Sequence, residues 1–310
     1  MDPIFSGISL RDARVALLDL AMPRRCIVCG RTLALRERFI CLDCQADFPY
    51  THYWERTHNP MADRINARIQ HDLDHLPPPS PSALPPCPSE PLSCPSELPS
   101  CPSEFPHGPS APLSCPSERS EESIPPPSPP HEPYAFAAAL FFYNSASDYH
   151  RIPWHLKYEG GLAAGRHFAR MLGARLASAP QFADVDVVIP VPLHWTRQWR
   201  RGYNQAEVIA REIANVLGAE LRTDILRRSR RTRSQVGLPT EAKAANVRGA
   251  FSLPAGYPQN RDNLRARHIL LVDDTFTTGS TMDACRAVLR QAFPLPTRIS
   301  FTTLAFVSSE

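Results

Sequence analysis

Lysine is almost absent from this 310-residue chain, which has only Lys157 and Lys243 among its 34 positively charged residues. All the others are arginines, a bias that is typical of genome composition rather than of a mechanism. Long hydrophobic runs are absent as well. No segment reaches the roughly 18 consecutive apolar residues that a membrane-spanning helix needs, so we expect no membrane span.

A typical secretory signal is also missing. The first fourteen residues include Asp2, Asp12 and two arginines, and Asp19 interrupts the apolar stretch 15–20. A signal peptide needs an unbroken apolar segment after a basic one. We therefore expect a cytoplasmic protein, in which cysteines stay reduced and bind metal more often than they form disulfides.

The net charge is only +3, but the two signs are unevenly distributed. Residues 77–133 contain seven glutamates and one arginine, whereas residues 194–233 contain ten arginines, three glutamates and one aspartate. A local basic surface is therefore more informative than the total charge.

A proline- and serine-rich tract occupies residues 77–133, with 21 prolines and 13 serines in 57 residues. Cys-Pro-Ser-Glu recurs in it at 87–90, 94–97, 101–104 and 115–118. Such a composition cannot bury enough apolar surface to offset its chain entropy, so we predict a disordered linker. Each repeat has one cysteine followed by proline, so duplication in a tolerant segment explains the repeats better than a metal-binding array does.

The tract divides the chain into three predicted parts. Residues 1–76 form an N-terminal helix and a small cysteine module, residues 77–133 the linker, and residues 134–310 a globular domain. Strand-length apolar runs alternate in this domain with helix-length amphipathic segments, which predicts an α/β fold with a mostly parallel sheet flanked by helices. The expected strands are 135–143, 185–191, 269–272 and 299–307, and the expected helices are 150–158, 162–176, 204–217 and 282–292.

Four cysteines near the N-terminus have the spacing of a structural zinc site: Cys26, Cys29, Cys41 and Cys44. Two cysteines separated by two residues can direct both thiolates to one tetrahedral metal, and Gly30 permits the turn after the first pair. The short connection between the pairs is typical of a zinc ribbon. An iron–sulfur site and a redox dithiol pair are the alternatives. Four thiolates leave no open coordination position, so we expect no catalysis there.

The most informative segment is 268–281, which reads His-Ile-Leu-Leu-Val-Asp-Asp-Thr-Phe-Thr-Thr-Gly-Ser-Thr. An apolar strand ends in two adjacent carboxylates, Asp273 and Asp274, and a hydroxyl-rich turn leads into a helix. This order is typical of phosphate sites in α/β proteins. Two acceptors side by side suit the vicinal hydroxyls of a sugar. The candidates for the phosphate site are Thr275, Phe276, Thr277, Thr278, Gly279, Ser280 and Thr281.

A structural interpretation of this segment is the alternative. In that case Asp273 and Thr278 serve only as turn and cap residues.

The segment resembles the phosphoribosyl-pyrophosphate (PRPP) motif of type I phosphoribosyltransferases. Further motifs resemble, in order, the ComF competence-protein family, also called the GntX-like family. These motifs are 157–160 (Lys-Tyr-Glu-Gly), 188–194 (Val-Ile-Pro-Val-Pro-Leu-His), 200–207 (Arg-Arg-Gly-Tyr-Asn-Gln-Ala-Glu), 235–238 (Gln-Val-Gly-Leu) and 246–251 (Asn-Val-Arg-Gly-Ala-Phe). The resemblance includes the cysteine module and omits 77–133.

The resemblance implies a zinc ribbon joined to a phosphoribosyltransferase-like domain, in a family linked to DNA uptake or to the use of external DNA. It implies that Asp273 and Asp274 hold the ribose hydroxyls and that the following turn holds the 5′-phosphate. Mg²⁺ would accompany PRPP and bridge its pyrophosphate and ribose oxygens. Catalysis would be mainly electrostatic and positional.

Three arginines lie where the family places its pyrophosphate loop: Arg197, Arg200 and Arg201. Guanidinium groups bind phosphate oxygens in forked pairs, which suits an anionic leaving group. The carboxylates together with Arg200 and Arg201 are therefore the candidate catalytic residues, and Arg197 is a candidate ligand-binding residue. Lys157 has two interpretations, a pyrophosphate ligand in a flexible loop or an ordinary exposed lysine.

Two positions depart from related patterns. The position of Thr277 is commonly acidic in 6-oxopurine salvage enzymes, so threonine argues against that substrate class. Lys243 stands where many ComF-like chains have arginine, which keeps the charge.

Other basic and aromatic residues allow two interpretations. Trp195 and Trp199 interleave with arginines, as in a stacking surface for single-stranded nucleic acid. We interpret them as packing residues, because no nucleic-acid-binding fold signature accompanies them. The five arginines of 227–233 are interpreted as a solvated face, with phosphate or nucleic-acid contact as the alternative. We expect Cys285 to be a small buried hydrophobe.

Two classes of function follow. An enzyme would transfer phosphoribosyl from PRPP to an unidentified acceptor. A non-catalytic partner of DNA-uptake proteins would sense PRPP or a nucleotide, or would bind single-stranded DNA. An intact acidic pair and turn favour ligand binding in both classes, since the fold alone does not decide between them.

Overall fold

The computed structural model describes residues 16–20, 22–74, 132–144, 146–230, 249–255 and 266–308. The described residues up to Leu73 and from Glu132 onward belong to one compact unit. The predicted linker with its repeats lies outside the described residues, as do Lys243, the motif at 235–238 and three residues of the motif at 246–251.

Five parallel strands form the central sheet, in the order β1-β7-β6-β2-β3. β6 lies in the middle and pairs with β2 on one side and β7 on the other. A separate antiparallel pair is formed by β4 and β5. The strands are β1 (Ala137–Tyr143), β2 (Val187–Pro190), β3 (Glu220–Leu221), β4 (Arg227–Arg228), β5 (Phe251–Ser252), β6 (His268–Phe276) and β7 (Arg298–Val307).

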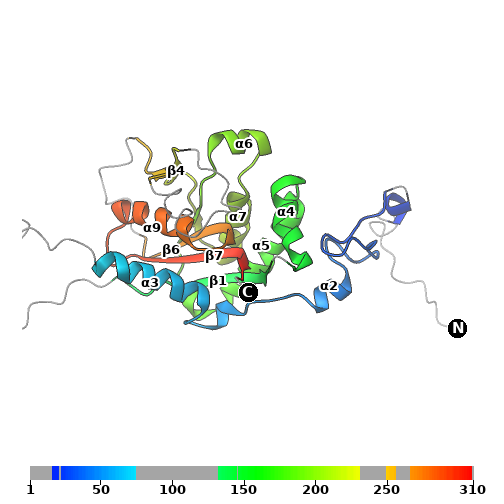
Figure 1. Cartoon of the computed structure of the whole chain (residues 1–310), viewed down its shortest axis with the longest axis horizontal. Helices are drawn as coiled ribbons and strands as arrows, with labels where there is room; N and C mark the ends of the chain where they lie inside the picture. Colours follow the sequence, from blue (N-terminus) through cyan, green and yellow to red (C-terminus); the bar gives the residue numbers. More distant parts are fainter. Residues whose placement is uncertain are drawn as a thin grey trace, which may run out of the picture. The chain divides into compact units, whose positions relative to one another are not determined.

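Helices cover the sheet (Figure 1), which confirms the predicted α/β fold with a mostly parallel sheet flanked by helices. None of the helices within the described ranges has the length and apolarity to span a bilayer. The helices are α2 (Leu42–Ala46), α3 (Pro60–Asp74), α4 (Arg151–Tyr158), α5 (Leu162–Ala177), α6 (Trp195–Arg201), α7 (Gln205–Leu217) and α9 (Ser280–Ala292), with 3-10 turns η1 (Tyr53–Glu55), η3 (Asp148–His150) and η4 (Pro180–Phe182).

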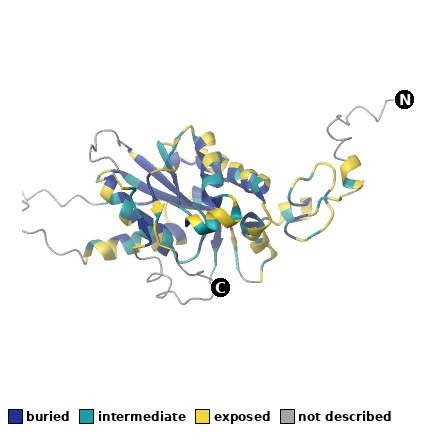
Figure 2. Cartoon of the chain, turned by 90° about the horizontal axis from the view of Figure 1, so that it is seen from above, coloured by how far each residue is buried: buried dark blue, intermediate teal, exposed yellow. Residues whose placement is uncertain are grey.

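The central strands are buried on both faces, as the dark core of Figure 2 shows. Alternate residues of a strand point to opposite faces. Val188 and Leu270 therefore pack in one cluster with α5 and α7, whereas their neighbours Ile189 and Leu271 pack in another with α3 and α9. A parallel sheet covered on both faces needs such continuous apolar strands.

Helix α3 belongs to this core although it precedes the proline-rich tract. Its Met61, Ile65 and Ile69 are buried in the same cluster as Leu289 of α9. The division into parts at 76 and 134 stays a prediction, but the helix before the tract is packed on the sheet after it.

One side chain, that of Arg286, contacts residues from both sides of the proline-rich tract. Arg286 of α9 is 5% exposed. Its Nη2 lies 2.7 Å from Asp72 Oδ2 and its Nη1 lies 3.1 Å from Glu132 Oε2. Arg290 pairs with the same glutamate at 2.7 Å. The Arg286–Glu132 pair is buried, and a buried pair is costly to break once one partner is removed, so Arg286 holds Asp72 of α3 and Glu132 together on α9.

Candidate functional site

The two carboxylates lie on the paired part of β6. The sequence predicted a strand at 269–272 with the acidic residues after it, but the strand runs to Phe276. Asp273 is opposite Thr303 of β7, and Thr275 is opposite Ala305. The strand continues because β7 offers a partner as far as Val307. The backbone of the acidic pair is therefore fixed by the sheet rather than by a turn.

The turn after β6 depends on Gly279. Its φ is +80°, a left-handed conformation that favours glycine, and it directly precedes α9. A Cβ atom at this position would lie 2.8 Å from the ring of Phe276, which stacks on Phe306. Glycine is therefore required both for backbone conformation and for space.

One oxygen of each carboxylate contacts a protein donor. Asp273 Oδ1 accepts a hydrogen bond of 2.8 Å from the backbone N–H of Asp274. Asp274 Oδ2 lies 2.9 Å from Nζ of Lys157. Burial raises the pKa of Asp273 to about 7, and repulsion by Asp274 acts in the same direction, against the attraction of Lys157 and Arg228.

Lys157 is not an ordinary exposed lysine, and its predicted role as a pyrophosphate ligand stays a prediction. It lies on α4 rather than in a loop, its side chain is 28% exposed, and it is paired with Asp274. Nζ also donates to Thr275 Oγ1 at 3.4 Å. Burial alone would lower the pKa of Lys157, but the attraction of the two carboxylates outweighs burial and raises it.

Two arginines of α3, which the sequence analysis missed, contact the turn. Arg64 Nη1 donates to Thr277 O at 3.4 Å, and Arg68 Nη1 donates to Ser280 Oγ at 3.3 Å. Ser280 Oγ is also 2.9 Å from Thr278 Oγ1. Arginines one helical turn apart were visible in the sequence, but nothing local indicated that α3 packs beside this turn.

Helix α6 carries the three predicted phosphate-binding arginines. It is capped by His194, whose Nδ1 accepts from Thr196 N, and it ends at Gly202 with φ +81°. Arg197 and Arg201 line the same cavity as the carboxylates, whereas Arg200 does not line it.

The tryptophans of α6 are not packing residues, so that interpretation was wrong. Trp195 is 71% exposed and Trp199 is 86% exposed. Both lie on a seven-residue helix that packs little of its surface, and none of its residues is buried. The alternation of tryptophan and arginine thus produces an exposed aromatic and basic surface.

One cavity of about 470 Å³ joins these features. The cavity is lined by the acidic pair and by all residues of 275–281 except Thr278. Three arginines also line it: Arg197, Arg201 and Arg228. Half-exposed Trp154 and Tyr158 of α4 form a further wall. The cavity therefore combines carboxylates, hydroxyls, guanidinium groups and aromatic rings, which suits a phosphorylated polar ligand with a flat portion.

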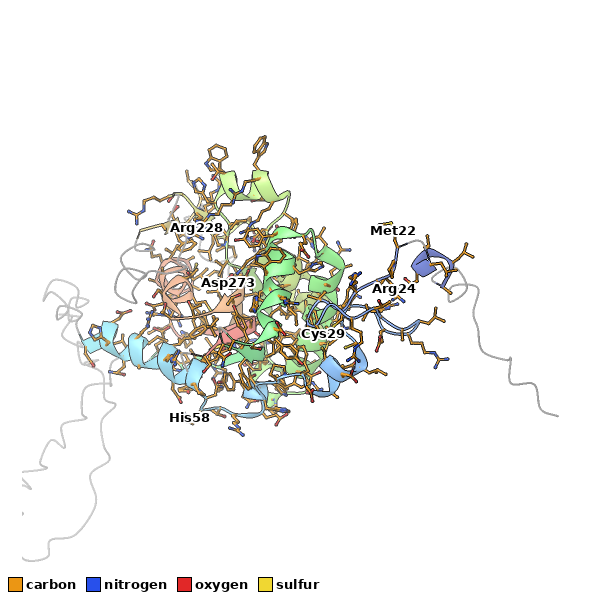
Figure 3. All side chains as sticks on the ribbon, turned by 45° about the vertical axis from the view of Figure 1, so that its right-hand side comes forward. Met22, Arg24, Cys29, His58, Arg228 and Asp273 are labelled. Atoms are coloured by element: carbon orange, nitrogen blue, oxygen red, sulfur yellow. The ribbon has the colours of Figure 1, made fainter. Side chains whose placement is uncertain are left out.

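Arg228 is part of this cavity rather than of a solvated face. It is half-buried on β4, and its guanidinium lies over the ring of Phe251 at 5.1 Å. Burial and repulsion by Arg197 lower the pKa of Arg228, while Asp273 acts in the opposite direction. Its neighbours Arg227 and Arg230 are exposed, and Arg231 and Arg233 lie outside the described residues. Figure 3 labels Arg228 and Asp273 in the globular part of the chain.

The four N-terminal cysteines come together as predicted and could hold a metal such as zinc. Their sulfurs lie within 4.8 Å of one another, and Cys29 Sγ is 3.6 Å from Cys41 Sγ. Tetrahedral zinc with bonds of about 2.3 Å requires sulfurs roughly 3.8 Å apart, so the geometry fits. Cys41 N donates to Cys26 Sγ at 3.4 Å. Within the described ranges this is the one group of its kind.

The ribbon contacts the helix that carries Lys157. Arg151, the first residue of α4, donates to Val28 O at 2.9 Å, between the first two cysteines. Tyr149 Oη donates to Cys44 O at 2.8 Å. The predicted metal site and the acidic pair are thus joined through one short helix.

A serine, a histidine and an aspartate form a chain at the far end of β6. His268 Nδ1 lies 2.6 Å from Asp184 Oδ1, and its Nε2 lies 2.7 Å from Ser300 Oγ. Both His268 and Ser300 are 0% exposed, so no substrate reaches them. Burial lowers the pKa of His268. We interpret this network as structural. Cys285 is also fully buried, as predicted.

The chain is similar to proteins named for competence and for DNA utilization. Competence protein F of Haemophilus influenzae is 33% identical over 138 residues, which is 44% of this chain and 58% of that protein. DNA utilization protein YhgH of Salmonella typhimurium is 30% identical over 147 residues, 44% of this chain and 61% of the relative. YhgH of Escherichia coli K12 is 32% identical over 97 residues, 31% of this chain and 40% of the relative. The matches confirm the resemblance to the ComF-like family, although the chain spans only about half the length of these relatives.

No family model matches the chain. Among solved structures, the crystal structure of TT1426 from Thermus thermophilus aligns with 47% of this chain and 84% of that chain. The identity is 18% and the TM-score is 0.27, which is too low to support a statement about fold or function.

Proposed function

We propose that the cavity binds PRPP or a related phosphoribosyl ligand and that the protein transfers phosphoribosyl to an unidentified acceptor. One observation carries the proposal: the acidic pair, the hydroxyl-rich turn and two arginines of α6 line a single cavity. This set supplies acceptors for sugar hydroxyls and donors for phosphate groups at separate places.

The hydrogen bonds of the acidic pair support recognition of a vicinal diol. One oxygen of Asp273 is taken by a backbone N–H, and one oxygen of Asp274 is taken by Lys157. Among the described residues, no further hydrogen bond or ion pair to these carboxylates is found. The second oxygen of each can accept a hydroxyl, which suits adjacent hydroxyl groups of a ribose better than a deoxyribose.

The 5′-phosphate and the pyrophosphate of the ligand would lie at different places in the cavity. Residues 277–279 form the turn before α9, Ser280 and Thr281 are the first residues of α9, and backbone N–H groups at the beginning of a helix favour a phosphate monoester. Arg197 and Arg201 would bind the pyrophosphate. Arg200 lies outside the cavity lining, so its proposed role requires movement of α6. Mg²⁺ prefers oxygen ligands and would enter with the pyrophosphate, where it would offset negative charge.

The remaining parts of the proposal concern cell context. The names of the relatives support a link to DNA uptake or to the use of external DNA. We also propose that the cysteine ribbon holds a structural zinc ion and that the protein is cytoplasmic, where the thiolates would stay reduced.

A non-catalytic role is the second candidate. In that case the protein would sense PRPP or a nucleotide, or would bind single-stranded DNA, as a partner of DNA-uptake proteins. The exposed tryptophans of α6 favour this candidate, because exposed aromatic rings among arginines suit stacking with unpaired bases. A salt-dependent gel shift with single-stranded DNA that is weakened in Trp195→Ala/Trp199→Ala would support DNA binding.

Calorimetry tests ligand binding. PRPP with Mg²⁺ is titrated into the wild type and into Asp273→Asn/Asp274→Asn, and we expect heat only from the wild type. Absence of heat from both proteins would reject the site. Release of pyrophosphate with a panel of nucleobases then separates the enzyme from the sensor. If binding occurs but no acceptor releases pyrophosphate above background, the sensor is favoured.

A further inference from the structure

Lys157 is held firmly beside the acidic pair. The helix that carries it packs closely on α5, where a Cβ atom at Gly165 would lie 2.5 Å from Leu156. Tyr203 Oη donates to Leu156 O, and Gly160 with φ +66° ends the helix. The backbone of Lys157 is thus fixed by packing, by a hydrogen bond and by a turn.

Among the described residues, the ammonium group of Lys157 is the cation that forms an ion pair with the acidic pair. Asp273 and Asp274 are adjacent, and two carboxylates so close repel one another, so one tends to take up a proton. The groups that face them are Lys157 from α4, Arg228 from β4, Tyr143 from β1 and Cys285 from α9. Lys157 Nζ lies 2.9 Å from Asp274 Oδ2, and it also donates to Thr275, the next residue of β6.

The choice of lysine is informative in a chain that uses arginine almost everywhere. An ammonium group is a compact charge, whereas a guanidinium group is a planar fork that could occupy both oxygens of a carboxylate. Lysine therefore neutralises Asp274 through one oxygen and leaves the other as an acceptor.

We propose that Lys157 is a positioning residue that limits proton uptake by the twin carboxylates and holds Asp274 with one oxygen available to the ligand, rather than a ligand for pyrophosphate. The identity of the ligand rests on the proposed function, but the effect on the carboxylates does not. The pKa of Asp273 is raised to about 7 even with Lys157 present, so the acidic pair is partly protonated at neutral pH. Removal of this cation should raise the pKa further, so that a larger fraction of the pair is protonated at neutral pH.

The first test needs no ligand. Aspartate carboxyl groups are labelled with carbon-13, and their titration is followed by NMR between pH 5 and 9 in the native state, with Asp273→Asn to assign the signal. We expect a midpoint near that of the wild type for Lys157→Arg and a midpoint higher by about one pH unit or more for Lys157→Met. An unchanged midpoint in Lys157→Met would overturn the proposal.

Arg170→Met is the matched control. Arg170 of α5 pairs with Glu212 of α7 at 2.7 Å, and the Arg170 side chain is 59% exposed. The variant removes an ion pair far from the carboxylates and should leave the midpoint of Asp273 unchanged. Because the signals come from folded protein, a variant that fails to fold is recognised by its spectrum, and Lys157→Gln then replaces Lys157→Met.

The second test uses ribose 5-phosphate, which has hydroxyls and a phosphate but no pyrophosphate. We expect the wild type to bind it more tightly at pH 8 than at pH 6. We expect Lys157→Met to bind it about fivefold more weakly than the wild type at pH 7, because a midpoint higher by about one pH unit lowers the ionised fraction of Asp273 from about one half to about one eleventh. Equal affinity in both proteins at every pH contradicts the proposal.

The two tests separate the two claims. If ribose 5-phosphate does not bind to the wild type, the proposed function fails, while the carboxyl titration still decides the role of Lys157. If Lys157→Met loses affinity for the sugar phosphate without any change of the carboxyl midpoint, Lys157 contacts the ligand itself and the positioning role is overturned.

Discussion

Replacement of Asp273 by asparagine should change how stability depends on pH. The pKa of this carboxyl group is raised from 3.8 to about 7, mainly by burial and also by Asp274. A carboxyl group with a higher pKa in the folded state stabilises the fold at low pH, and the contribution is lost as the pH rises through the folded pKa. Asparagine has no charge at any pH, so Asp273→Asn removes this dependence.

The magnitude follows from the size of the shift. Each pH unit between 5.5 and 7 costs the wild type about 1.4 kcal/mol, which gives roughly 2 kcal/mol up to pH 8.5. The carboxyl group is half-buried, and solvent reduces the effect. We therefore expect the difference in free energy of unfolding, Asp273→Asn minus wild type, to increase by about 1–2 kcal/mol as the pH rises from 5.5 to 8.5.

Urea unfolding of ligand-free protein at pH 5.5, 7 and 8.5 measures this difference. Asp47→Asn replaces an exposed carboxylate and is the control, since its effect should stay within about 0.5 kcal/mol across the range. A difference between Asp273→Asn and the wild type that is the same at every pH would refute the reasoning.

Three further predictions concern the turn, the ribbon and the tract. Gly279→Ala should lower the free energy of unfolding by about 1–2 kcal/mol or more in urea titrations, because alanine is strained at φ +80° and its Cβ would meet Phe276; an unchanged midpoint would contradict this. Removal of metal with a chelator should speed hydrogen exchange in α4 but not in α7, because the ribbon holds the beginning of α4; equal protection with and without metal would show that the ribbon does not support this helix. Deletion of 80–130 should change the free energy of unfolding by less than about 1 kcal/mol, because Asp72 and Glu132 are already held together by Arg286 and loop length has a weak effect; a large loss would show that the tract contributes to the core.

The β6–turn–α9 segment was predictable because its signals are local. An apolar run, two carboxylates, a glycine and an amphipathic segment occur in the order in which the structure uses them. The cysteine cluster was predictable for the same reason, since two Cys-x-x-Cys pairs leave few arrangements. The pattern of apolar residues did not predict that β6 continues to Phe276, because pairing with β7 extends the strand beyond its apolar run.

The other contacts of the site come from distant parts of the chain. Lys157 meets Asp274, and Arg68 meets Ser280, across more than a hundred residues in each case. No periodicity or spacing encodes these pairs, because they depend on how α3 and α4 pack on the sheet. The exposure of Trp199 was missed because a tryptophan ring is usually at least partly buried, but α6 is too short to bury it.

A crystal structure of the protein soaked with PRPP and Mg²⁺ tests the central claim most directly. The account predicts that Asp273 and Asp274 accept hydrogen bonds from the two ribose hydroxyls and that the 5′-phosphate lies in the turn before α9. Electron density for the ligand elsewhere, with both carboxylates contacting only protein atoms, would contradict the account.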